Sequence, residues 1–240
     1  MIAPQTHERR RVSSANLILV AVGACAISSC GGGGGASGSA ALQSVQAPSL
    51  PIYIPGTTLK ATDGSGNTWS ATYSSTAAGT STFNGQVAYL TPIFFTVEEN
   101  GTVIDSESYS EFALMNPYSP LGLTEGFSAL PGRLSVGSIT SFDPLPSTLT
   151  VGTSGPLRSG TLGGSSYPFS ETYSVTPNNS TALFLNIHSD YPDFGVFHGE
   201  ASLTGLYSGT STITYSITSS GVATLTKIQV AINGTTLVFQ

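Results

Sequence analysis

The sequence predicts an all-β protein built from antiparallel hairpins, arranged as a β-sandwich or a partly open barrel. From Leu50 onward, apolar and polar residues alternate with a period of two between turn residues, and no amphipathic helix of useful length occurs. Ile213, Tyr215 and Ile217, for example, alternate with threonine and serine, which is typical of a strand with one buried face. Threonine, valine, isoleucine and tyrosine, which favour strands, are abundant. Two Asn-Gly pairs supply the tight turns that hairpins need.

The first residues of the chain have the order of a secretion signal. Three arginines at 9–11 precede an apolar run of eleven residues at 17–27, and Ser28 and Ser29 separate that run from Cys30. An apolar run of this length is typical of a signal peptide and is too short for a stable membrane-spanning helix. The serines supply the small side chains that a signal peptidase requires. We therefore expect export, with cleavage immediately before Cys30.

The segment Ile27-Ser28-Ser29-Cys30 resembles the lipobox of bacterial lipoprotein precursors, in which the cysteine receives acyl chains such as palmitate before the signal is removed. This resemblance implies a signal peptide over 1–29 and a mature chain held at a membrane by its lipidated Cys30. Each buried methylene of the acyl chains contributes about 0.8 kcal/mol. Gly31 follows, where the family reserves aspartate for retention in the inner membrane, so the resemblance implies the outer membrane of the cell envelope.

Glycines at 31–35 predict a flexible Gly/Ser-rich tether over 30–48, directly after the cysteine. Two other interpretations of the leader remain open. Small residues also precede Cys25, although the apolar run continues past it. An ordinary signal peptide with a chance cysteine would instead be cleaved nearer Ala40.

The first β-rich half is predicted over 49–114, and a turn at 63–67 separates two of its strands. Every second residue of this turn carries a side-chain oxygen, as in a calcium-binding loop. The calcium pattern then fails, because Thr68 and Ser74 replace the glycine and the bidentate glutamate that such a loop needs. We therefore predict a plain turn that begins at Asp63.

The two Asn-Gly pairs predict hairpins with two-residue type I′ turns. The first pair, at 100–101, places on one face the cross-strand pairs Val97 with Ile104 and Phe95 with Ser106. The second pair, at 233–234, places on one face the pairs Ile228 with Phe239, Val230 with Leu237 and Ile232 with Thr235. The last strand then runs to Gln240 as part of a sheet.

Two proline-containing segments, 117–122 and 143–146, interrupt the alternation between these hairpins. We predict that 115–146 connects the first β half to a C-terminal β half over 147–240. One short strand is expected near 134–142 within this connection.

Several pieces of the C-terminal half match a loose pattern. They are 145–152 with 154–157, Tyr-Ser-Val at 173–175, the apolar strand at 183–187 and Gly-Thr-Thr-Leu at 234–237. Together they resemble uncharacterised β-rich envelope proteins of proteobacteria. The resemblance implies export and a β architecture, and it brings no known activity and no catalytic residues.

Charge limits the partners of the mature chain. Without residues 1–29 the chain keeps four of its seven Lys and Arg residues and twelve of its thirteen Asp and Glu residues, so its net charge is −8. Four cations cannot neutralise a run of phosphates, which argues against nucleic acid and against electrostatic docking on anionic lipid. The two cysteines, Cys25 and Cys30, leave the β region without a disulfide or a thiolate metal site.

The residues at 188–200 are the strongest candidates for metal binding. If 191–195 form a five-residue loop, His188 lies opposite His198 and Glu200 lies near both, within reach of a divalent transition metal. The alternate residues of the same strands are apolar and predict the core, so the histidines fall on the solvent face, where polar residues are expected. We therefore predict no metal site, with His188, His198 and Glu200 as weak candidates.

Catalytic signatures are missing from the sequence. No Gly-x-Ser-x-Gly elbow occurs, and the glycine clusters lack the context of a phosphate-binding loop. Six acids predict a charged sheet face rather than a general acid–base pair; they are Glu98, Glu99, Asp105, Glu107, Glu111 and Glu125. We predict neither enzyme activity nor a cofactor.

The sequence thus predicts a lipid-anchored cell-envelope protein with a non-catalytic structural or binding role. The alternative is a carrier or sensor that holds an apolar or carbohydrate ligand between β layers, since the strand tyrosines could line such a groove as well as pack the core. A metal-dependent hydrolase centred on the histidines is a third class. A large apolar cavity would favour the carrier, and a solid core would argue against it.

Overall fold

The computed structural model describes residues 42–127, 134–162, 167–191, 209–232 and 235–240. These residues form strands joined by turns and loops, which confirms the predicted all-β class. Over the same residues, no helix has the length and apolar character needed to cross a membrane.

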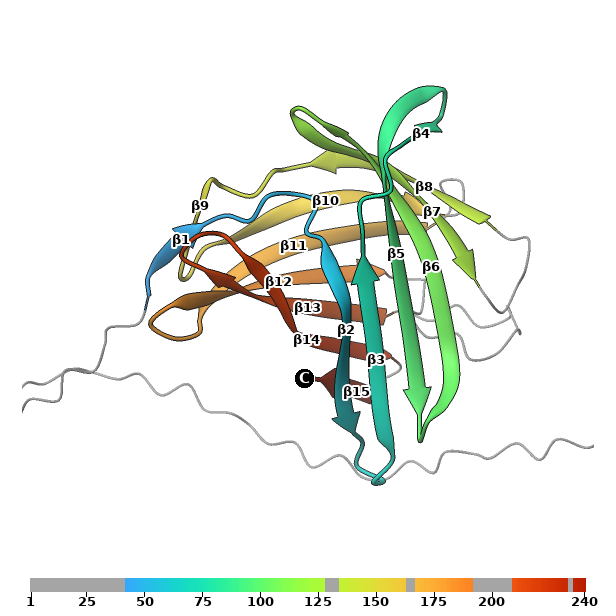
Figure 1. The fold of residues 1–240 in the computed structure, drawn as a ribbon, viewed down its shortest axis with the longest axis vertical. Coiled ribbons are helices and arrows are strands. Elements are labelled where there is room, and N and C mark those ends of the chain that lie inside the picture. The colour runs from blue at the N-terminus through green and yellow to red at the C-terminus, as the bar shows by residue number, and fades with distance from the viewer. Residues whose placement is uncertain (1–41, 128–133, 163–166, 192–208, 233–234) are drawn as a thin grey trace, which may run out of the picture. The chain divides into compact units, whose positions relative to one another are not determined.

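The strands follow one another along the chain as labelled in Figure 1. In the described residues they are β1 (Ser44–Gln46), β2 (Ile54–Thr62), β3 (Thr68–Ser75), β4 (Thr80–Phe83), β5 (Gln86–Glu99), β6 (Thr102–Met115), β7 (Tyr118–Phe127), β8 (Leu134–Phe142), β9 (Thr148–Thr150), β10 (Ser154–Leu162), β11 (Tyr167–Pro177), β12 (Ala182–Tyr191), β13 (Gly209–Thr218), β14 (Ala223–Ile232) and β15 (Thr235–Phe239).

Most of these strands belong to one antiparallel sheet in which neighbours along the chain are neighbours in space. Its order is β15-β14-β13-β12-β11-β10-β8-β7-β6-β5-β3-β2, with β4 paired to β5 outside this path. Strands β1 and β9 form a separate two-stranded sheet. Antiparallel order along the chain is expected where short turns join successive strands.

The large sheet curls until its first and last strands meet. Figure 1 shows β2 beside β15. The backbone amide of Lys60 donates to the carbonyl of Gln240 at 3.3 Å, and the amide of Gln240 donates to the carbonyl of Lys60 at 3.0 Å. This reciprocal pair joins the two edges, so the sheet forms a nearly closed barrel, within the predicted choice of sandwich or partly open barrel.

Apolar side chains from alternate strand positions fill much of the interior. Val97, Leu183 and Phe239 are fully buried and belong to the main core cluster. The small β1–β9 sheet adds Val45 and Leu149 to the same cluster. Since successive side chains on a strand point to opposite faces, the period-two pattern of the sequence becomes an inside and an outside.

A second, smaller cluster lies on the other face of the sheet. Phe83 on β4 stacks on Phe112 on β6, with ring centroids 4.9 Å apart, and Ala88 packs with them. Gly122 on β7 lies opposite Phe112, and a Cβ there would meet the Phe83 ring at 2.2 Å. Glycine at 122 therefore lets the β4–β5 hairpin pack closely on the sheet.

The hairpin at 100–101 forms, but its predicted register is wrong by one residue. Asn100 and Gly101 have positive φ angles of 51° and 77°, as a type I′ turn requires. A β-bulge between Val97 and Glu98 leaves one extra residue, at position 104 of β6. It shifts every pair that lies farther from the turn. The observed pairs are Val97 with Asp105 and Phe95 with Glu107, in place of Ile104 and Ser106.

The register predicted for the last hairpin is confirmed, although its turn at 233–234 lies outside the described residues. The observed pairs are Ile228 with Phe239, Val230 with Leu237 and Ile232 with Thr235. The turn at 63–67 is also confirmed, since it joins β2 to β3 and its first and last residues share a backbone hydrogen bond of 3.1 Å.

The predicted connection over 115–146 is wrong. The strand expected near 134–142 is β8, but β7 precedes it and both lie inside the continuous sheet. Pro120 fits within β7 because a bulge between Phe112 and Ala113 interrupts the regular pairing beside it. The two predicted halves are therefore parts of one sheet.

Candidate ligand-binding cavity

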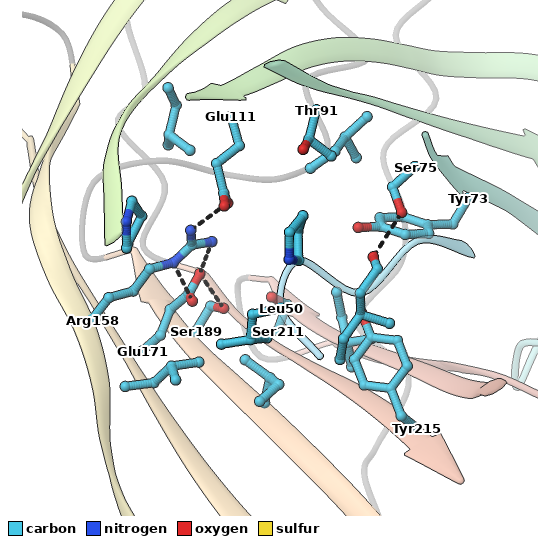
Figure 2. A pocket seen from close by; sticks show the side chains of 18 of the residues that line it. Leu50, Tyr73, Ser75, Thr91, Glu111, Arg158, Glu171, Ser189, Ser211 and Tyr215 are labelled. Carbon is cyan, nitrogen blue, oxygen red and sulfur yellow. Dashed lines mark hydrogen bonds and ion pairs between the residues drawn. The ribbon is translucent and has the colours of Figure 1, made fainter. Parts of the chain in front are cut away.

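The inner face of the curled sheet lines a cavity of about 210 Å³ that is partly open to solvent. Side chains from β3, β5 to β8 and β10 to β14 line it, together with the loop before β2. Most of the wall is apolar and includes Ile93, Phe95, Ile187 and Ile213. Figure 2 shows the polar lining residues, with Arg158, Glu111 and Glu171 gathered on one side.

Strand register explains why polar side chains meet inside the barrel. Glu171 on β11 lies opposite Arg158 on β10 and Ser189 on β12, and Ser189 lies opposite Ser211 on β13. Residues directly opposed on neighbouring antiparallel strands share a face of the sheet. All four line the cavity, so they form one polar row across its wall.

Arg158 is held between two carboxylates. Its Nε donates to Oε2 of Glu171 at 2.6 Å and its Nη2 donates to Oε1 at 3.1 Å, which is a bidentate pair. Its Nη1 donates to Oε2 of Glu111 at 2.5 Å. The side chains of Arg158, Glu111 and Glu171 are only 17%, 9% and 5% exposed. Because Glu111 lies on β6, beyond β7 and β8, the ion pairs link separate parts of the wall.

Tyr118 extends this cluster toward β7. Its hydroxyl donates to Oε1 of Glu111, and its ring packs edge-on against Phe142 with centroids 5.5 Å apart. Burial raises the pKa of the Tyr118 hydroxyl well above its usual range, and the charge of Glu111 and the hydrogen bond with it raise it further. The phenol is therefore neutral at physiological pH and acts as a hydrogen-bond donor.

Two further tyrosines lie across the cavity from Arg158 in Figure 2. Tyr73 and Tyr215 are 7% and 6% exposed. Burial raises the pKa of the Tyr215 hydroxyl, and Tyr73 and Glu171 raise it further. Tyr215 therefore contributes a neutral hydroxyl to the wall.

Thr91 and Ser75 differ in how their buried hydroxyls are satisfied. Ser75 accepts a hydrogen bond from the Ile54 amide at 2.9 Å and donates to the Ile52 carbonyl at 3.0 Å. Thr91 lies directly opposite Glu111, is 5% exposed and lines the cavity, as Figure 2 shows. Among the described residues, no side chain or backbone group forms a hydrogen bond with its hydroxyl.

The predicted pairing of His188 with His198 is wrong. Strand β12 pairs on both edges, so the residues opposite His188 are Thr172 and Thr212. The His188 ring is exposed, and its Nδ1 lies 3.0 Å from the Thr212 hydroxyl. His198 and Glu200 lie outside the described residues. Within the described ranges, no group of three His, Cys, Asp or Glu side chains could hold a metal ion.

Two other residues were singled out in the sequence, Cys30 and Asp63, and the structure describes only Asp63. Cys30, the predicted lipidation site, lies outside the described residues. Asp63 accepts hydrogen bonds from the Ser65 and Asn67 amides, from the Asn67 side chain and from the Trp69 indole. The side-chain hydrogen bond from Asn67 makes the largest contribution to a pKa of Asp63 lowered to about 2. These donors surround the carboxylate as in a plain turn.

Sequence reasoning missed the cavity cluster. It assigned Glu111 to a charged outer face, whereas the side chain is buried and binds Arg158. The available signal was a polar residue on an apolar face, because Glu171 alternates in phase with the buried Phe169 and Val175. Ser189 likewise continues an apolar face of β12.

Comparison of the chain with protein-family models, with curated proteins and with solved structures found no match.

Proposed function

We propose that this protein is a lipid-anchored cell-envelope protein whose barrel binds a small ligand. The cavity of about 210 Å³ is the observation that supports binding. Protein interiors are normally packed as densely as organic crystals, with few voids larger than a water molecule. An apolar cavity of about 150 Å³ already holds benzene, so the space in this barrel suits a ligand with a body of roughly that size.

The composition of the cavity wall favours a ligand site over a packing defect. Small-molecule sites are concave and mostly apolar, with a few polar groups that fix the orientation of the ligand. Here the apolar wall is joined by one buried cluster around Arg158. An acyl anchor on Cys30 would hold such a site at the membrane surface.

Binding can be tested with N-phenyl-1-naphthylamine, a neutral fluorophore that brightens in apolar surroundings. The purified protein should bind it saturably. Ser211→Phe places a ring in the cavity and should weaken binding by about tenfold or more, since the ring occupies space that the ligand needs. Thr172→Phe adds the same ring on the exposed face of β11 and should leave binding unchanged.

Two results would overturn the binding proposal. One is that the parent protein shows neither saturable fluorescence nor calorimetric binding of 2-phenylethanol, a one-ring alcohol that needs less room than the three-ring fluorophore. The other is equal binding by the Ser211→Phe and Thr172→Phe variants, because the probe would then lie outside the cavity. Either result would leave a structural role in the envelope as the better interpretation.

The anchor is tested separately, by mass spectrometry of the mature protein from envelope fractions. The expected N-terminus is an acylated Cys30, and Cys30→Ala should accumulate as an unacylated precursor. Cys25→Ala should be processed like the parent. An unmodified N-terminus near Ala40, or acylation at Cys25, would support one of the other interpretations of the leader.

A further inference from the structure

We propose that the ligand is a small amphipathic organic cation, with an ammonium head on an apolar body about the size of one ring. This inference rests on the proposed binding function and adds the chemistry of the head group. Three observations on the described residues carry it: the charge of the cavity lining, the acceptor positions of Glu111 that no described donor uses, and the Thr91 hydroxyl, which no described group contacts by a hydrogen bond.

The described cavity lining carries more negative than positive charge. Arg158 is its cation, and Glu111 and Glu171 are its carboxylates. Counting one formal charge for each of these three side chains, the lining has a net charge of −1. Lys60 and Lys227 are not among the lining residues. A ligand with one positive charge therefore brings the net charge of the cavity to zero, whereas a ligand with one negative charge brings it to −2.

Arg158 is not arranged to clamp an anion. Its Nε, Nη1 and Nη2 each donate to a carboxylate of this protein, and the bidentate edge is occupied by Glu171. An incoming carboxylate or phosphate would therefore meet two like charges beside a guanidinium already in use. This geometry disfavours fatty acids and other anionic amphiphiles.

Glu111 keeps room for further donors. Its Oε1 accepts from the Tyr118 hydroxyl and its Oε2 accepts from Arg158. Each carboxylate oxygen has two acceptor positions, so one position on each oxygen is left. An ammonium group has three donors and no acceptor, which matches a site of this kind.

The Thr91 hydroxyl supplies a second contact for the same head group. Thr91 lies opposite Glu111 on the adjacent strand, where Cβ atoms are about 4.5–5.5 Å apart. A buried hydroxyl that no other described group satisfies is uncommon, and it can bond a water, an ion or a polar ligand group. Together, Thr91 and Glu111 form a two-point acceptor seat for one ammonium group.

The rest of the wall selects the body of the ligand. Ile93, Phe95, Ile187, Ile213 and Val230 are apolar residues of the same cavity lining. A sugar carries a hydroxyl on nearly every carbon and would have to place some of them against these apolar side chains, which is costly. A hydrocarbon ring or short alkyl chain meets no such cost, so the cavity favours an amine with an apolar body over a carbohydrate.

Three ligands of matched size test the head group. 2-Phenylethylamine is a cation at pH 7, 2-phenylethanol is its neutral counterpart and 3-phenylpropionate is an anion. Displacement of N-phenyl-1-naphthylamine should give the amine an affinity about tenfold or more above that of the alcohol, because charge-assisted hydrogen bonds are about twice as strong as neutral ones. The propionate should bind most weakly.

Two variants connect this preference to the proposed seat. Glu111→Gln keeps the shape of the side chain and removes one charge. Its amide oxygen can still accept from Arg158, and its amide NH2 can donate to the Tyr118 hydroxyl. The preference for the amine over the alcohol should therefore fall by about tenfold. Thr91→Val replaces the hydroxyl with a methyl group of similar size and should weaken amine binding several-fold. Thr172→Val, on the exposed outer face, is the matched control and should change nothing.

The outcomes separate the head-group inference from the binding proposal. Equal affinity for amine and alcohol, or tighter binding of the propionate, overturns the inference that the ligand is a cation. Saturable fluorophore binding would still support a ligand cavity in that case. If the parent protein binds neither the fluorophore nor any of the three one-ring ligands, both proposals are overturned. If Glu111→Gln does not fold, Thr91→Val decides, since unchanged amine affinity in that variant overturns the seat.

Discussion

At the residue scale, Asp63 links turn chemistry to pH. Hydrogen bonds lower its pKa from 3.8 to about 2, so this carboxylate contributes stability that is fully present above about pH 4 and is lost as the pH falls through about 2. We predict that Asp63→Ala lowers the melting temperature at pH 7. The difference from the parent should shrink between pH 4 and pH 2, because the parent carboxylate then protonates. Thermal unfolding followed by circular dichroism measures both.

Asp190→Ala is the control for Asp63, since Asp190 is an exposed carboxylate on β12. It should change the melting temperature little at any pH. A destabilisation by Asp63→Ala that stays constant from pH 7 to pH 2 would contradict the role assigned to the charged carboxylate.

Gly122 is required by its surroundings rather than by its backbone conformation. An added Cβ would lie 2.2 Å from the Phe83 ring and 2.3 Å from the carbonyl oxygen of Gly137, and the backbone atom cannot move aside easily. We predict that Gly122→Ala lowers the free energy of unfolding by about 1–3 kcal/mol or more. Urea denaturation measures the loss.

Gly56→Ala is the control for Gly122, because an added Cβ at Gly56 has no neighbour within 4 Å. It should change the free energy of unfolding by less than about 0.5 kcal/mol. Similar losses for both alanines would argue against close packing of the β4–β5 hairpin on the sheet.

Turn residues were predictable because their partners are near in sequence. Asp63 contacts residues at most six positions away. Arg158 and Glu111, by contrast, are separated by 47 positions. No local sequence pattern indicates which distant carboxylate an arginine will pair with. The charged residues of the site are visible in the sequence, but their ion pairs could not be predicted from it.

At the element scale, β15 joins the last part of the sheet to β2. Phe239 is fully buried in the core, whereas Val238, the preceding residue, is 39% exposed. We predict that Phe239→Ala lowers the free energy of unfolding by about 3–5 kcal/mol, because it removes a ring from the packed core. Val238→Ala should cost less than about 0.5 kcal/mol. Equal losses in urea denaturation would show that β15 is not packed as described.

Strands were predictable wherever alternation was regular. The last hairpin has its predicted register from Ile228 to Phe239 because no bulge interrupts it. The hairpin at 100–101 has a bulge after Val97, and the sequence beside it carries no glycine to mark the extra residue. Strand β7 was not predicted for a related reason. Pro120 indicated a break in the strand pattern, but a bulge in the pairing with β6 accommodates this proline within the strand.

At the scale of the whole molecule, the sequence determined which side chains share a face but not how the sheet curves. Sandwiches and barrels both bury alternate residues, so the period-two pattern fits either. The contact that decides between them joins Lys60 to Gln240, near opposite ends of the described chain. The cavity follows from that closure. Alternation in the sequence does not show the closure, so it could not predict whether a cavity is present.

Charge balance inside the barrel gives a prediction for the molecule as a whole. Arg158→Met leaves Glu111 and Glu171 buried without their cation and should lower the free energy of unfolding at pH 7 by about 3–5 kcal/mol. The triple variant Arg158→Met, Glu111→Gln, Glu171→Gln removes all three charges and keeps acceptors for Tyr118 and Ser189. Because a buried ion cluster roughly breaks even against neutral groups, we expect the triple variant to unfold within about 1 kcal/mol of the parent.

The same triple variant separates stability from binding. If the cluster exists to recognise a cation, the neutral barrel should keep its affinity for N-phenyl-1-naphthylamine and 2-phenylethanol and lose its preference for 2-phenylethylamine. If the cluster exists to hold β6, β10 and β11 together, the triple variant should be nearly as unstable as Arg158→Met. Urea denaturation and ligand displacement on one preparation distinguish these outcomes, since a structural cluster changes the first measurement and a recognition cluster changes the second.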